Sequence, residues 1–140
     1  MNIIDKIERN FFLKEIFPYG IEGEIFIGSI EFHSSKAISI QIHTKQKPEK
    51  EIKKWGIWGK NYNTIAIEVL ISFVEKSEVI NWQKAKASQI NFSHKNNISS
   101  ISLEGYDWHI SFKAEVLTFQ KCSVYIDTAE DIEESQPNAQ

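Results

Sequence analysis

Apolar and polar residues alternate along most of the chain between residues 25 and 126. The alternation is clear at Ile38, Ile40 and Ile42, and it returns over residues 108–114 and 122–126. A period of two is typical of strands with one dry face and one wet face. The pattern predicts a mainly β (α+β) fold, an antiparallel meander, sandwich or partly open barrel of about seven or eight strands. The longest alternating set that shares one expected dry face is Ile65, Ile67, Val69, Ile71 and Phe73.

The first two expected strands carry a defect in this alternation. The apolar positions shift by one between residues 25–27 and 30–32, across Gly28 and Ser29. A glycine at such a shift indicates a β-bulge or a bend. The turn-forming stretch at residues 34–36 should then join the two strands as a hairpin.

The N-terminal residues follow a different period. Over residues 3–16, Ile3, Ile4, Ile7 and Phe11 recur at spacings of three and four. This spacing predicts one helix, ended by the proline and glycine of residues 18–20. One helix before a run of strands gives a single β-rich domain over residues 1–127 and an acidic tail over residues 128–140.

Charge is distributed unevenly along the chain. The net charge is −3, but the last thirteen residues hold four acids and no base. Without these four, 15 acids face 16 bases, so the body is almost neutral. We expect the tail to be solvated and disordered, and consider it a possible arm for a basic partner. Its acids are Glu130, Asp131, Glu133 and Glu134.

The single cysteine and the composition of the N-terminus bear on location. One cysteine forms neither an internal disulfide nor a cysteine-based zinc site, which favours a reducing compartment. The N-terminus mixes charged with apolar residues and lacks the pattern of a signal peptide. No apolar run is long enough to span a membrane. We therefore expect a cytoplasmic protein.

Residues able to carry chemistry are few. The four histidines show no spacing typical of a metal pair, and we expect them to be exposed or satisfied by local hydrogen bonds. Cys122 lies in an alternating stretch, as a small buried residue would. The chain contains no GxSxG, P-loop, GxGxxG or HExxH motif. We therefore expect no catalytic residues and no metal site.

The stretch KKWGIWGKNYN at residues 53–63 is basic and rich in aromatic residues. Lysines for phosphates and indoles for stacking would suit a nucleic acid, but the nearly neutral body argues against this. Tryptophan is also frequent in protein interfaces. Alternatively, Trp55 and Trp58 close the open end of the sheet. Whichever of the two is exposed is the first candidate for an interface.

Three segments together resemble a known family. They read WGKNYNTIAIEVL, INWQKA and LEGYDWHISFKAEVLTFQKCSVYI. Their order and their tryptophans and glycines are similar to those of the immunity protein 50 family of bacterial polymorphic toxin systems. The resemblance covers roughly residues 20–127. It implies a small cytoplasmic antidote, encoded beside a toxin, that binds the cognate toxin domain and blocks it, without enzymatic activity, cofactor, direct nucleic-acid contact or membrane.

No family motif identifies the binding residues, so the candidates come from side-chain chemistry alone. They are Trp55, Trp58, Tyr62, Trp82 and the four acids of the tail. The same aromatic residues would suit a small-ligand or carbohydrate-binding β domain, which is the alternative function. An enzyme with His33, His43 and His109 at the mouth of a barrel is a third hypothesis.

Overall fold

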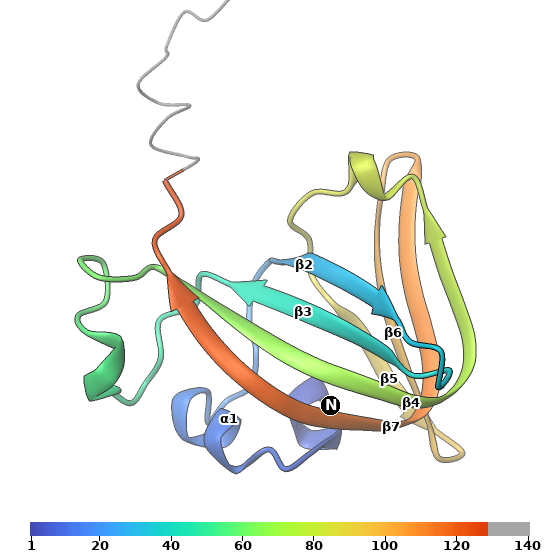
Figure 1. Ribbon diagram of the computed structural model, residues 1–140, viewed down its shortest axis with the longest axis horizontal. Coiled ribbons are helices and arrows are strands. Elements are labelled where there is room, and N and C mark those ends of the chain that lie inside the picture. The colour runs from blue at the N-terminus through green and yellow to red at the C-terminus, as the bar shows by residue number, and fades with distance from the viewer. Residues whose placement is uncertain (129–140) are drawn as a thin grey trace, which may run out of the picture.

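The computed structural model describes residues 1–128, which form one seven-stranded sheet with short helical segments (Figure 1). The sheet order is β2-β3-β4-β7-β6-β5, and these neighbours are antiparallel. The short β1 pairs with β7 in parallel. The strands are β1 (Ile7–Glu8), β2 (Ile25–Phe32), β3 (Ile38–Thr44), β4 (Thr64–Ile80), β5 (Asn91–Lys95), β6 (Ile98–Gly105) and β7 (Trp108–Tyr125).

This arrangement confirms the prediction of a mainly β fold with antiparallel pairing. The sheet is open rather than closed, because β2 and β5 are its two edges. It is also not a simple meander, since β4 pairs with β7 along its whole length. None of the helices in the described residues is long and apolar enough to cross a membrane.

The N-terminal segment is not the continuous helix expected over residues 3–16. It contains the 3₁₀ turn η1 (Ile3–Lys6), β1, and the helix α1 (Phe11–Ile16). The chain leaves the helical path at Arg9, whose φ of 62° lies in the left-handed region. Pairing of β1 with β7 gives the intervening backbone other hydrogen-bond partners. The two helical pieces bury Ile3 and Ile4 of η1 and Leu13 and Ile16 of α1, whereas Phe11, which the spacing also assigns to the apolar face, is 81% exposed.

The hairpin of β2 and β3 has the form expected. The register between the strands shifts between Ile27 and Ser29, so Gly28 is the extra residue of a bulge. A turn closes the hairpin with a hydrogen bond from the His33 N–H to the Ala37 carbonyl. Both predictions for this region are confirmed.

β4 and β7 bend together, so that each contributes to both halves of the sheet (Figure 1). Along β4, every second residue faces the core up to Ile71. The next residue that faces the core is the half-buried Val74, three positions later. On β7 the corresponding step is from Leu117 to Ala114. A spacing of three instead of two turns one residue of each strand outward at the corner. Phe73 is that residue in β4, with φ 54° and 71% exposure.

The expectation that Phe73 belongs to the dry face is therefore wrong. An aromatic residue with positive φ is rare, and the corner of the sheet explains its presence here.

The core lies between the dry face of the sheet and the N-terminal segment. Its largest contributions come from the alternating isoleucines of β3 and β4, which are essentially inaccessible to solvent. Leu13, Ile16 and Phe17 cover them from the side of α1. Trp108, Ile110 and Phe112 extend the same core into the other half of β7. Each fully buried large aliphatic side chain contributes about 1.5–3 kcal/mol to folding.

Candidate functional site

Residues 53–63 form an aromatic plug at one end of the sheet. Trp55 ends the 3₁₀ turn η2 (Lys53–Trp55) and is only 8% exposed. Its ring meets those of Phe12 and Tyr62 edge to face, with centroids 5.5 Å and 5.7 Å away. The Trp58 ring also packs edge to face with Tyr62, with the centroids 5.3 Å apart. Trp55 and Tyr62 are core residues, as expected for a segment that closes the sheet.

Two glycines explain how the plug folds. Gly56 and Gly59 both have φ 87°, a conformation that residues with a Cβ rarely adopt. The Asn61 side chain accepts a hydrogen bond from the Ile57 N–H and fixes the loop between them. Because Trp55 and Tyr62 are buried, they can influence a partner only through the fold. The apolar part of the surface of this segment is made by the exposed Ile57 and the half-buried Trp58, and lysines make much of the rest.

Trp82 lies in a different part of the molecule. It begins the 3₁₀ turn η3 (Trp82–Lys84), and its side chain is 67% exposed. In Figure 1 this turn lies at the top of the upright half of the sheet, far from η2 at the left edge. The turn is fixed to the β6–β7 connection, because the Asn81 side chain donates to the Asp107 carbonyl and Lys84 pairs with the Asp107 carboxylate. The structure thus does not bring Trp82 together with Trp58.

An apolar hollow of about 380 Å³ lies beside Trp82, between the edge strand β2 and the far half of β4 and β7. A second hollow of about 370 Å³ continues from it and shares four of its lining residues, Ile27, Trp82, Ala85 and Ile110. Phe32 is 60% exposed at its rim. We call the first hollow the β2 groove, defined by Ile27, Ile30, Phe32, Val79, Trp82 and Ile110.

The β2 groove follows from the bent, open sheet. The dry face of β2 carries Ile27, Ile30 and Phe32, as the alternation predicts. The bend places Val79 and Ile110 of the far half opposite them. No strand in residues 1–128 fills the space between these two walls. Ile27, Ile30, Phe32 and Val79 therefore remain partly open to solvent, whereas Ile110 is buried.

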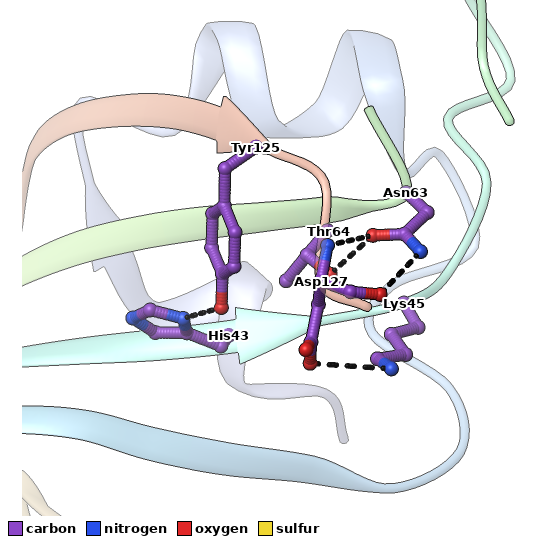
Figure 2. A network of polar contacts seen from close by, with 6 residues as sticks. All are labelled: His43, Lys45, Asn63, Thr64, Tyr125 and Asp127. Carbon is purple, nitrogen blue, oxygen red and sulfur yellow. Dashed lines mark hydrogen bonds and ion pairs between the residues drawn. The ribbon is translucent and has the colours of Figure 1, made fainter. Parts of the chain in front are cut away.

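A polar network joins β3 to the end of β7 on the wet face of the sheet (Figure 2). The His43 Nδ1 lies 2.7 Å from the Tyr125 hydroxyl, and its Nε2 lies 3.2 Å from Gln41 Oε1. Burial lowers the pKa of His43, although the Asp127 carboxylate partly opposes this shift. Burial also raises the pKa of Tyr125. Both groups are therefore neutral near pH 7 and hold each other in place.

Asn63 fixes the last described residues to the same network. Its side-chain oxygen accepts from the Asp127 N–H at 2.8 Å, and its side-chain nitrogen donates to the Asp127 carbonyl at 3.0 Å. Lys45 pairs with the Asp127 carboxylate at 3.3 Å. This part of the network anchors the chain just before the tail. Glu130, Asp131, Glu133 and Glu134 lie outside the described residues.

The remaining titratable candidates have local partners. His33, His94 and His109 each hydrogen-bond a nearby serine hydroxyl. Residues 1–128 contain no group of three or more His, Cys, Asp and Glu side chains that could hold a metal ion. Burial raises the pKa of Cys122 to about 12, so its thiol is protonated at neutral pH. The barrel-mouth enzyme hypothesis finds no support in this geometry.

These features define a small, open β domain that presents an apolar groove along one sheet edge. The chain belongs to the family described as Immunity protein 50, whose model matches residues 22–125. The resemblance noted from the sequence is thereby confirmed. No curated protein and no solved structure matches the chain significantly. The matched range includes every strand from β2 to β7, and so the whole β2 groove, but leaves out η1, β1 and α1.

Reasoning from the sequence did not identify the β2 groove. Trp82 is a candidate from the sequence because tryptophan is frequent in interfaces, whereas Ile27, Ile30 and Phe32 have the alternation of ordinary core positions. No sequence signal marks the groove, because the apolar side chains of β2 are open to solvent only as a result of its place at the sheet edge, which is a tertiary property.

Proposed function

We propose that this protein is an immunity protein that binds a cognate bacterial toxin domain and blocks it directly. Membership of the Immunity protein 50 family over residues 22–125 carries this proposal. We further propose that it acts in the cytoplasm of the producing cell, as part of a polymorphic toxin system that mediates contact-dependent inhibition. The proposed mechanism is stoichiometric binding, without catalysis or a cofactor.

The physical features of the molecule suit such a role. A stoichiometric inhibitor needs a rigid scaffold and at least one apolar anchor that a partner can desolvate. The long pairing of β4 with β7 and the continuous core supply the scaffold. Exposed Trp82 and Phe32, beside the β2 groove, supply anchors of the residue types that are common in interfaces.

The alternative of a carbohydrate-binding domain is less well supported. A sugar platform needs its aromatic rings side by side on one surface. Trp55 and Tyr62 are buried, and Trp58 and Trp82 line different hollows that share no residue. These four residues therefore do not form one platform.

Co-expression with the toxin domain encoded beside this chain tests the proposal. Cells that carry the toxin domain alone should stop growing, and cells that also carry this protein should grow normally. Calorimetry with the two purified proteins should then give one-to-one binding with a Kd on the order of nanomolar. Failure of the protein both to protect cells and to bind would refute the proposed function.

A further inference from the structure

The edge of β2 carries unused backbone hydrogen-bonding groups beside the β2 groove. At its start, Ile25 pairs with Ser88 through two hydrogen bonds, each 2.9 Å long. Past this bridge, no strand in residues 1–128 pairs with the outer edge of β2. The segment before Ser88 instead turns away toward η3 (Figure 1). The chain thus begins a strand pairing here and leaves the rest of the edge open.

Alternation shows which residues face that open edge. His33 donates its N–H to Ala37, across the hairpin. In an antiparallel pair, residues that bond to one neighbour alternate with residues whose N–H and C=O point the other way. Glu31 therefore bonds toward β3, while Ile30 and Phe32 direct their backbone groups outward.

The same two residues also supply apolar surface. Ile30 and Phe32 have their side chains on the dry face of β2 and line the β2 groove together with Val79 and Trp82. An extended chain placed along this edge would thus find hydrogen-bond partners for its backbone and an apolar hollow for alternate side chains. This combination is the basis of recognition by strand addition.

The charges around the groove indicate what kind of chain would fit. None of the residues that line the β2 groove is charged, and several charges on the neighbouring elements are paired within the protein. Lys76 lies 3.4 Å from Glu78, and Lys84 pairs with Asp107. Glu31, whose carboxylate lies 3.7 Å from the ring of His33, and Lys86, which lines the second hollow, carry charges of opposite sign. The surface around the groove therefore has no strong electrostatic potential of one sign. Such a surface is complementary to an uncharged, apolar segment rather than to a basic or acidic one.

We propose that the β2 groove receives an extended segment of the cognate toxin domain. The segment adds a strand to β2 at Ile30 and Phe32 and places an uncharged apolar side chain between Val79 and Trp82. This inference rests on the proposed function and names the surface that performs it. A second copy of this chain is the competing occupant, because an open edge can also pair with itself.

Binding of the purified toxin domain to matched variants tests the proposal. Trp82→Ala and Phe32→Ala each remove an exposed ring from the groove, and each should weaken binding roughly tenfold or more. Phe11→Ala and Tyr19→Ala remove rings that are 81% and 80% exposed but lie outside the groove. These two control variants should bind as the wild-type protein does. Thermal unfolding of all four should show that they remain folded.

Hydrogen exchange of the complex tests the strand addition itself. The amides of Ile30 and Phe32 should become protected when the toxin domain binds. Weaker binding by the groove variants without this protection would overturn strand addition. Protection of the same amides on concentrating the protein alone would instead assign the edge to a second copy.

Binding measurements distinguish failure of the proposed function from failure of the β2 groove as the binding surface. If wild-type protein does not bind the toxin domain at all, the proposed function fails, and this inference fails with it. If wild-type protein binds and the groove variants bind equally well, the toxin uses another surface. The proposed function would then stand without the β2 groove.

Discussion

The His43 ring and the Tyr125 hydroxyl meet at 2.7 Å across the wet face of the sheet, although 82 positions separate them in sequence. They belong to β3 and β7, the two neighbours of β4, so the contact passes over the strand between them. Ala66 of β4 lies in register with His43 and is only 6% exposed. A small side chain at this position leaves room for the two rings, whose contact Figure 2 shows.

This arrangement predicts that stability depends on the charge of His43. Because burial lowers its pKa in the folded protein, the unfolded chain binds a proton more readily. The contribution of the neutral ring is fully present above the unfolded pKa of about 6.5 and is lost as the pH falls through the lower folded value. Urea unfolding should therefore show less stability at about pH 5 than at about pH 7.5.

The matched variant for this test is His43→Gln, which keeps a polar side chain but cannot take up the proton. Its loss of stability between the two pH values should be smaller than that of the wild-type protein. Equal losses in the two proteins would show that His43 does not cause the pH dependence.

A second prediction concerns Gly28, over which the His43 ring lies. A Cβ at this position would come within 2.0 Å of His43 Nε2, too close for the ring to stay where it is. Gly28→Ala should therefore destabilise the protein by about 1–3 kcal/mol, measured by urea unfolding. Ser29→Ala, at the exposed neighbouring position, should change stability by less than about 0.5 kcal/mol.

A double-mutant cycle separates this clash from a general effect on the bulge. If the cost of Gly28→Ala comes from His43, it should shrink clearly when His43 is already alanine. An unchanged cost in that background would place the effect in the bulge backbone instead.

Much of the fold could be predicted because local patterns record burial. The polarity of each strand residue indicates whether its side chain lies on the dry or the wet face of the sheet. The alternation therefore predicts the strands, the bulge and the hairpin. Residues 3–16 and Phe73 were the exceptions. In both places tertiary structure overrides the local period. In residues 3–16 the cause is the pairing of β1 with β7, and at Phe73 it is the joint bend of β4 and β7.

The candidate site is much less predictable, because it depends on the absence of a neighbouring strand along the outer edge of β2 within residues 1–128. The sequence does not state that β2 is an edge, nor that the bend brings Val79 opposite Ile30. The exposure of a tryptophan is equally a tertiary property. Trp55 and Trp82 look alike as candidates, yet one lies in the core and the other on the surface.

A third prediction concerns the reactivity of Cys122. With a pKa of about 12 the folded thiol is almost entirely protonated, so a disulfide reagent should find little thiolate to react with. At about pH 8 the folded protein should react on the order of a thousandfold more slowly than the urea-unfolded protein. Absorbance of the released thiol measures both rates, and Cys122→Ser serves as the blank. Rates within about tenfold of each other would show that Cys122 is accessible and ionised in the fold.

The last prediction contrasts two tryptophans that the sequence does not distinguish. Trp55→Ala removes a buried ring that contacts both Phe12 and Tyr62, and should cost about 3–5 kcal/mol of unfolding free energy because a cavity remains. Trp82→Ala removes a ring that is 67% exposed, and should change stability by less than about 0.5 kcal/mol. Chemical denaturation followed by circular dichroism measures both. A large loss for Trp82→Ala would mean that this ring supports the fold, and its effect on binding could then not be attributed to contact with a partner.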